Sequence, residues 1–209
     1  MTGYGLSHFN LLESVVPADW LRDGVLGYQM LSAIAEEVSV LGHSTGSNVA
    51  IYIAKHYPVK NLILSGANLF IGPDDAKYKR ILNNPFLSPV VKHLIPMFEK
   101  PTRPDRTTNT DTLDPIAAEQ CFHYSSLPIE SLDTVWGMQD IIDLRKAKYE
   151  ELFILYGKKD VTVNVDRLLH YLDKHKIQYT PEGFANSGHN IFEDYEKDNV
   201  IRSVLKILQ

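Results

Sequence analysis

The amino-acid sequence predicts an α/β fold, in which a mostly parallel β-sheet carries helices on both faces. Short apolar runs rich in β-branched residues alternate with longer segments whose apolar residues recur at helical spacing. Strands that alternate with helices favour a parallel sheet, because each parallel pair needs a crossover connection. With 209 residues, the chain is long enough for one sizeable hydrophobic core and short for two.

The first part of the chain opens with residues 1–16, which we expect to form a loop. Pro17-Ala18-Asp19 is typical of a helix start. We expect this helix to continue to about Glu36, followed by a strand at 38–42, a helix that ends before Pro58 and a buried strand at 61–66. The apolar stripe of the first helix comprises Trp20, Leu21, Val25, Tyr28, Leu31 and Ile34.

The middle of the chain has a different pattern. Seven prolines in residues 67–127 separate short amphipathic pieces at 76–82, 89–98 and 116–124. This pattern predicts a helical cap inserted into the core, so that 1–66, 67–127 and 128–209 form three regions. Residues 77–106 carry a net charge of +5, which indicates either a solvated face or attraction to anionic substrates or a membrane surface.

The last part of the chain returns to alternating strands and helices. The periodicity predicts a helix from Pro128 to about Lys146 and a strand at 151–157. The elements expected after that strand are a helix at 165–175, a shorter strand at 176–181, a loop at 183–190 and a helix at 192–208.

A strand, an abrupt turn and a helix are predicted around Ser44. An apolar run precedes Gly42-His43-Ser44-Thr45-Gly46, and a segment with helical spacing follows it. The turn matches G-x-S-x-G, in which glycines leave room for a strained serine backbone between a strand and a helix. We therefore predict that Ser44 projects its Oγ atom from the top of the sheet.

Three residues in three separate loops are candidates for catalysis. A serine hydroxyl needs a base to take its proton and a third group to orient that base. Ser44, Asp160 and His189 each follow the C-terminal end of a predicted strand, where α/β sheets present ligand-facing groups. The other carboxylates that could take the place of Asp160 are Asp140, Asp143 and Asp194.

These segments resemble the α/β-hydrolase family, and most of all its carboxylesterase and monoacylglycerol-lipase-like members. The likeness lies in GHSTG after VSVL, GKKD after LFILY and SGH before NIF. It implies that Ser44 is the nucleophile, that His189 is the general base and then the acid, and that Asp160 orients His189. It also implies hydrolysis of a small-molecule carboxylic ester through an acyl-enzyme, with no cofactor and no metal ion.

The resemblance also implies what surrounds the serine. Gly42 and Gly46 would shape the turn, and the backbone N–H of Thr45 would supply one donor of an oxyanion hole. We expect the imidazole of His43, which lies inside the turn, to pack against its neighbours rather than to act as a base. The residues expected to line the substrate pocket are His43, Leu69 and Phe70.

The sequence departs from the family pattern at its start. Gly3-Tyr4-Gly5 resembles the G-H-G that follows the fourth strand in the family, so we expect the preceding strands and the loop with the second oxyanion donor to be missing. Loss of one donor lowers turnover by about 10²–10³-fold. An alternative function is therefore a catalytically impaired module that binds a small ligand or a protein. A further alternative keeps the triad but cleaves a thioester, an amide or a carbon–carbon bond.

The same departure would leave the strand at 38–42 as an exposed edge. Such an edge invites pairing with another chain. We therefore expect a homodimer through this edge, completion by a separate chain, or an altered sheet.

Composition limits which partners and which cellular compartment fit this chain. A net charge of −5 and a pI near 5.9 argue against nucleic acid as a partner. The single cysteine, Cys121, excludes an internal disulfide and suits a reducing compartment. No apolar run has the length of a membrane span, and no signal pattern opens the chain. We expect a cytoplasmic protein without a stable membrane anchor.

Overall fold

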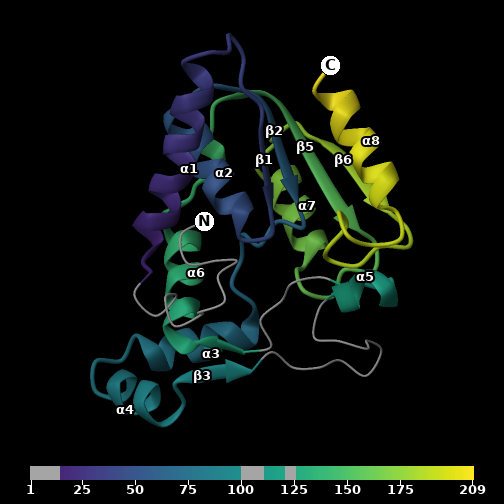
Figure 1. The fold of residues 1–209 in the computed structure, drawn as a ribbon. Helices are drawn as coiled ribbons and strands as arrows, with labels where there is room; N and C mark the ends of the chain where they lie inside the picture. The colour runs from purple at the N-terminus through teal and green to yellow at the C-terminus, as the bar shows by residue number, and fades with distance from the viewer. Residues whose placement is uncertain (1–14, 100–110, 121–125) are drawn as a thin grey trace.

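A computed structural model describes residues 15–99, 111–120 and 126–209, which form a parallel sheet with flanking helices and a smaller cap (Figure 1). Four strands make the sheet: β1 (Val40–His43), β2 (Val59–Ser65), β5 (Tyr149–Gly157) and β6 (Thr180–Phe184). The helices are α1 (Pro17–Ser32), α2 (Gly46–His56), α3 (Pro73–Leu82), α4 (Leu87–Leu94), α5 (Pro115–Gln120), α6 (Ile129–Ile141), α7 (Val165–Lys174) and α8 (Lys197–Ile207).

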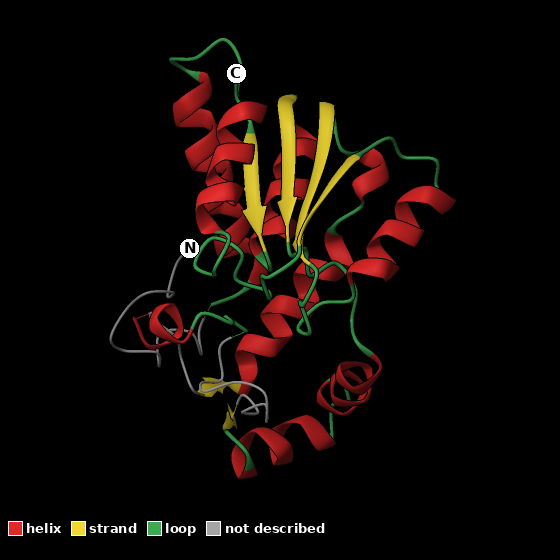
Figure 2. Cartoon of the chain, turned by 90° about the vertical axis from the view of Figure 1, so that its right-hand side faces the viewer, coloured by secondary structure: helices red, strands yellow, loops and turns green. Residues whose placement is uncertain are grey.

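The sheet has the strand order β1-β2-β5-β6, and all of its neighbouring pairs are parallel. Leu64 of β2 is in register with Gly42 of β1 and with Ile154 of β5. The carboxyl ends of the strands consequently meet at one edge of the sheet, which faces the cap (Figure 2). The prediction of a mostly parallel α/β fold is confirmed.

The two faces of the sheet bury separate hydrophobic clusters. Leu62 and Leu64 of β2 belong to a large cluster with residues of α1, α2, α6 and α7. Ile63, which points the other way because side chains alternate along a strand, packs with Val200 of α8. Helices therefore cover both faces, and α8 lies across the sheet from α2 (Figure 1).

The elements that we call the cap, α3, α4, β3 (Met97–Glu99), β4 (Ser126–Pro128) and the start of α6, lie beyond the carboxyl edge of the sheet. The division into the regions 1–66, 67–127 and 128–209 stays a prediction. Leu82 of α3 and Val91 of α4 pack with Ile129 and Trp136 of α6. The cap also holds a two-stranded antiparallel sheet of β3 and β4, which was not predicted. Pairing of Phe98 with Leu127 spans 29 residues, so local periodicity cannot reveal it.

Several predicted boundaries were wrong by a few residues. The strand expected at 176–181 begins at Thr180, because Lys176 adopts φ +55° and the chain turns back so that the N–H of Ile177 bonds to the carbonyl of Leu172. The last helix begins at Lys197, since residues 191–196 form turns. The first helix ends at Ser32, so that Ile34 lies beyond it and is exposed.

Two further elements differ from expectation. The helix predicted from Pro128 to Lys146 breaks after Ile141, and Asp143 caps a short 3-10 turn at Leu144–Lys146. The amphipathic piece expected at 116–124 is helical to Gln120, and residues 121–125 lie outside the described part. The N-terminal loop expected over residues 1–16 also lies outside it, apart from residues 15 and 16.

Strand β1 forms one end of the sheet. Within the described ranges it pairs with β2 alone, and its Leu41 is 40% exposed. Pairing of this edge with a second chain stays a prediction. Among the described residues, no helix is long and apolar enough to cross a membrane.

Candidate active site

Ser44 lies at the sharp turn between β1 and α2. Its backbone adopts φ +52°, a conformation that costs energy for a residue with a side chain. The turn is held because the N–H of Ser44 bonds to the carbonyl of Ser65 at 2.8 Å and the N–H of Ser47 bonds back to the Ser44 carbonyl at 3.0 Å. The predicted strand–turn–helix is present, with Ser44 at its tip.

Gly42 shows why the turn needs a glycine before the serine. A Cβ atom at this position would lie 2.4 Å from the carbonyl oxygen of Gly46 and 2.7 Å from Cα of Ser47. The Oγ of Ser47 also donates to the Gly42 carbonyl at 2.8 Å. Strand β1 and the first turn of α2 are thus in direct contact at the place where a side chain on residue 42 would lie.

The three residues expected to act together lie within hydrogen-bonding distance. Nε2 of His189 is 2.8 Å from Oγ of Ser44, and Nδ1 of His189 is 2.9 Å from Oδ2 of Asp160. An ionised carboxylate can only accept, so Nδ1 carries the proton and Nε2 is left to accept from the serine hydroxyl. The arrangement can therefore move the Ser44 proton to the imidazole.

Asp160 is held in its ionised form by its loop. Burial opposes ionisation, but the hydrogen bond from His189 outweighs it, together with the N–H groups of Val163 and Thr162, and the pKa of the carboxyl falls below its usual value. Those two N–H groups donate to Oδ1 at 3.0 and 2.8 Å, which leaves Oδ2 for the histidine.

His43 lies beside the catalytic candidate His189, with their ring centroids 5.0 Å apart. Its Nδ1 is 3.1 Å from Oγ of Ser65, and its Nε2 is 3.4 Å from Oδ1 of Asn190. Burial first, and then the charge of His189, lower its pKa from 6.5 to about 4. His43 is therefore neutral at pH 7 and packs against the site.

The backbone N–H of Thr45 follows the serine at the start of α2. In the described part of the chain it donates to no acceptor. A free N–H at this position, next to the positive end of a helix, can bind an oxygen that carries negative charge.

Two buried carboxylates near the site were not predicted to have a structural role. Asp194 is fully buried and accepts four backbone N–H groups at 2.8–3.0 Å. Its donors are Leu113, Asp114, Gly188 and Tyr195. Asp194 thereby joins the segment before α5 to the loop that carries His189.

Asp111 makes the matching connection to the acid loop. Its Oδ2 accepts from the N–H of Val161 at 3.1 Å and from the hydroxyl of Thr162 at 2.8 Å. Its carbonyl accepts from the N–H of Asn190 at 3.2 Å. Nothing in the local sequence marks Asp111, because its partners lie 50 and 79 residues away.

The other two carboxylates that could have replaced Asp160 have different partners. Asp140 pairs with Lys79 at 2.6 Å, and Asp143 pairs with Arg145 at 2.8 Å. Asp140 belongs to α6, and Asp143 follows its end. The residues that the structure describes contain no group of three histidine, cysteine or acidic side chains placed to hold a metal ion.

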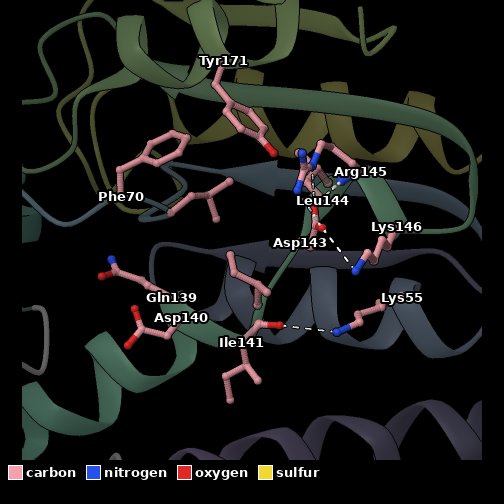
Figure 3. Close-up of a pocket in the computed structure, with 12 residues that line it drawn as sticks. Lys55, Phe70, Gln139, Asp140, Ile141, Asp143, Leu144, Arg145, Lys146 and Tyr171 are labelled. Atoms are coloured by element: carbon pink, nitrogen blue, oxygen red, sulfur yellow. Dashed lines mark hydrogen bonds and ion pairs between the residues drawn. The ribbon is translucent and has the colours of Figure 1, made fainter. Parts of the chain in front are cut away.

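Leu69 and Phe70, expected to line the substrate pocket, line a hollow in the structure, and its use by a substrate stays a prediction. Leu69 is buried in the large core cluster, and the ring of Phe70 packs against Tyr171 with centroids 5.3 Å apart. Figure 3 shows the pocket that they line, of about 480 Å³, between the end of α6 and α7. Its lining includes no member of the Ser44–His189–Asp160 group.

Solved structures resemble this chain, and three of them are described here. No protein-family profile and no curated protein match the sequence. A structure from work on LipS and LipT, two metagenome-derived lipolytic enzymes, is 18% identical with a TM-score of 0.73, and the match covers 99% of this chain and 78% of that one.

Two further structures are similar. A thermostable carboxyl esterase from Bacillus coagulans is 18% identical with a TM-score of 0.67 over 90% of this chain and 71% of that one. A monoacylglycerol lipase from Paleococcus ferrophilus is 15% identical with a TM-score of 0.63, over 89% of this chain and 74% of that one. These likenesses show that the chain has the α/β-hydrolase fold.

Proposed function

We propose that this chain, which has the α/β-hydrolase fold, is a serine hydrolase that cleaves carboxylic esters. The observation that carries the proposal is the position of His189, whose two ring nitrogens lie 2.8 Å from the Ser44 hydroxyl and 2.9 Å from the Asp160 carboxylate. Esterases and lipases among the similar structures support the same class of substrate.

The first half of the reaction forms an acyl-enzyme. Nε2 of His189 takes the hydroxyl proton of Ser44 as Oγ bonds to the ester carbonyl carbon. The carbonyl oxygen gains the negative charge and is stabilised by the N–H of Thr45. When this oxygen restores its double bond, the alcohol leaves and takes the proton from His189.

The second half returns the free enzyme. His189 accepts a proton from water, whose oxygen attacks the acyl carbon, and then gives that proton to Oγ of Ser44 as the carboxylic acid leaves. Asp160 stays ionised throughout and stabilises the imidazolium that forms twice in each cycle. Because Asp160 is already held as a carboxylate by the N–H groups of Thr162 and Val163, its own charge does not change during the reaction.

The first experiment tests whether Ser44 is an activated nucleophile. A fluorophosphonate probe should label the wild-type chain, and the variant Ser44→Ala should not be labelled. The matched control is Ser32→Ala, which changes an exposed serine on α1 and should leave labelling as it is.

The second experiment measures turnover on p-nitrophenyl esters of increasing acyl length. We expect Ser44→Ala to lower kcat by at least about 10⁴-fold. A panel with a matched thioester and anilide separates the related chemistries, because all three share a nucleophile and differ in the bond cleaved. An intact wild-type fold with neither labelling nor turnover would contradict the proposal and favour a ligand-binding or protein-binding module.

A further inference from the structure

A pair of buried residues contacts both the loop that carries Asp160 and the loop that carries His189. The two residues, Asp111 and Thr112, lie shortly before α5 and are 7 and 3% exposed. Both are far in sequence from the residues of the candidate site. Buried polar groups need hydrogen-bond partners, and this pair has partners in each of the two loops.

The first connection reaches the loop of Asp160. Oδ2 of Asp111 accepts from the hydroxyl of Thr162 at 2.8 Å and from the N–H of Val161 at 3.1 Å. The N–H of Thr162 in turn donates to Oδ1 of Asp160 at 2.8 Å. Thr162 therefore stands between two carboxylates, because its side chain is held by Asp111 and its backbone holds Asp160.

The second connection reaches the loop of His189. The N–H of Asn190 donates to the carbonyl of Asp111 at 3.2 Å, and Nδ2 of Asn190 donates to Oγ1 of Thr112 at 3.0 Å. Oδ1 of the same amide lies 3.4 Å from Nε2 of His43. Since Asn190 directly follows His189, these contacts hold the backbone from which the imidazole of His189 extends.

The pair also fits closely against the histidine loop. A Cβ atom on Gly188 would lie 2.7 Å from the carbonyl oxygen of Asp111 and 2.8 Å from its Oδ1. The two loops are joined nearer to the strands as well, where the N–H of Lys158 donates to the carbonyl of Phe184 at 2.8 Å. Asp111 and Thr112 add a connection at residues 161, 162 and 190, next to the side chains that would react.

We propose that Asp111 and Thr112 are positioning residues, which set how His189 and Asp160 lie relative to each other. The proposal rests on the proposed function, because the catalysis that it concerns is that of the Ser44–His189–Asp160 group. A displacement of about 1 Å at a reacting group can lower turnover by about 10²-fold, even when its cause lies outside the chemistry. Asp111 and Thr112 act through their neighbours Thr162 and Asn190.

Two pairs of variants remove one connection at a time. Thr112→Val removes the acceptor of Asn190, and Thr162→Val removes the hydroxyl that donates to Asp111, while each change keeps the shape of the side chain. We expect each to lower kcat on a p-nitrophenyl ester by about 3–10-fold, the equivalent of one lost hydrogen bond. KM should stay close to the wild-type value, because the base and not the substrate is displaced.

Thr112→Ser and Thr162→Ser retain the hydroxyl groups and should restore kcat. Thr162 is exposed, so its variants should fold even where a change at the buried Thr112 does not. The matched control is Thr180→Val, which changes an exposed threonine at the start of β6 and should leave kcat unchanged. Urea unfolding of every variant separates the two roles, since a purely structural contact would lower stability and leave kcat per folded molecule as it is.

A proton resonance gives a readout that does not depend on turnover. The Nδ1 proton of His189, shared with Asp160, should resonate well downfield of the backbone amides and be absent in His189→Gln. We expect both valine variants to shift or broaden this signal and both serine variants to restore it. If the wild-type chain showed neither labelling nor turnover, the proposed function would fail. A changed resonance would then still support the positioning role, and an unchanged one would overturn it.

Three results would contradict the proposal. One is a wild-type kcat and an unchanged resonance in both valine variants. Another is a fall in kcat that the serine variants or Thr180→Val share, since the loss of the hydroxyl contacts would then not be the cause. The third is a raised KM with an unchanged kcat, which would place these side chains in contact with the substrate.

Discussion

Nδ1 of His189 lies 2.9 Å from Oδ2 of Asp160, and the two side chains are 8 and 1% exposed. Adjacent strands bring them together, because β5 precedes the loop of Asp160 and β6 precedes the loop of His189. The loops are joined again where the N–H of Lys159 donates to the Ser187 carbonyl at 3.1 Å. This pair, sheltered from water, fixes which nitrogen of the imidazole faces Ser44.

The first prediction concerns the acid. Asp160→Asn should lower kcat on a p-nitrophenyl ester by about 10³–10⁴-fold, because the amide can donate to Nδ1 and so favour the tautomer whose Nε2 carries the proton. The Ser44 hydroxyl would then lose its acceptor. Steady-state kinetics of both enzymes at one and the same pH give the comparison.

The matched control for this change is Asp166→Asn. Asp166 is an exposed aspartate in the first turn of α7, on the element that follows the acid loop. It should leave kcat close to the wild-type value. If Asp160→Asn also retained full activity, another carboxylate would have to orient His189.

The second prediction concerns the turn that carries Ser44. Gly42→Ala should lower the free energy of unfolding by about 1–3 kcal/mol or prevent folding, because the new Cβ would lie 2.4 Å from the backbone oxygen of Gly46. Gly27→Ala is the control, since no atom lies within 4 Å of the corresponding Cβ on α1. That change should raise stability by about 0.5–1 kcal/mol. Urea unfolding curves of both variants test the pair, and equal stabilities would contradict the close contact.

The third prediction concerns the buried carboxylate behind the histidine loop. Asp194→Asn should lower the free energy of unfolding by about 2–5 kcal/mol, because the amide nitrogen would face the N–H groups of Leu113 and Gly188, which now bond to Oδ2. Activity should fall as well, since Gly188 directly precedes His189. Thermal unfolding and kcat are measured together.

The control for Asp194 is Asp198→Asn, which changes an exposed aspartate in the first turn of α8. It should change the midpoint of unfolding little. An Asp194→Asn variant with wild-type stability would show that the four hydrogen bonds do not hold the loop.

Local patterns were sufficient to predict most of the core and the three residues of the candidate site. The turn around Ser44 is encoded in adjacent residues, because only a glycine fits where β1 and α2 touch. Asp160 and His189 could be proposed from their positions after strands, since parallel strands end at one edge. The catalytic roles of these residues remain predictions until the variants are assayed.

What the sequence did not reveal depends on contacts between distant segments. Asp111 and Asp194 resemble many other polar loop residues, and their role appears only when the segment at 111–114 lies against both loops. The start of β6 was misplaced because the turn at Lys176 uses a left-handed backbone on a residue that rarely adopts one. The pairing of β3 with β4 was missed for the same reason as the two carboxylates.

The last prediction concerns pH and the neutral histidine. His43 has a pKa of about 4 in the folded chain and an ordinary value of 6.5 when unfolded. Between these values the unfolded chain binds more protons, so stability rises with pH across this window. The contribution of His43 to the free energy of unfolding is complete above pH 6.5 and is lost as the pH falls toward 4. The lowered pKa corresponds to about 3 kcal/mol in total, of which about 2 kcal/mol would be lost between pH 7 and pH 5.

Replacement of His43 should therefore flatten the dependence of stability on pH. His43→Gln and His43→Asn remove the titrating group, so each should lose about 2 kcal/mol less than the wild type when the pH falls from 7 to 5. Their stability at pH 8 reports separately what the lost contacts with Ser65 and His189 cost. Urea unfolding at each pH gives the curves. Parallel curves for the wild type and both variants would mean that the pKa of His43 is the same in the folded and the unfolded chain. The site would then tolerate a positive charge on His43 beside His189.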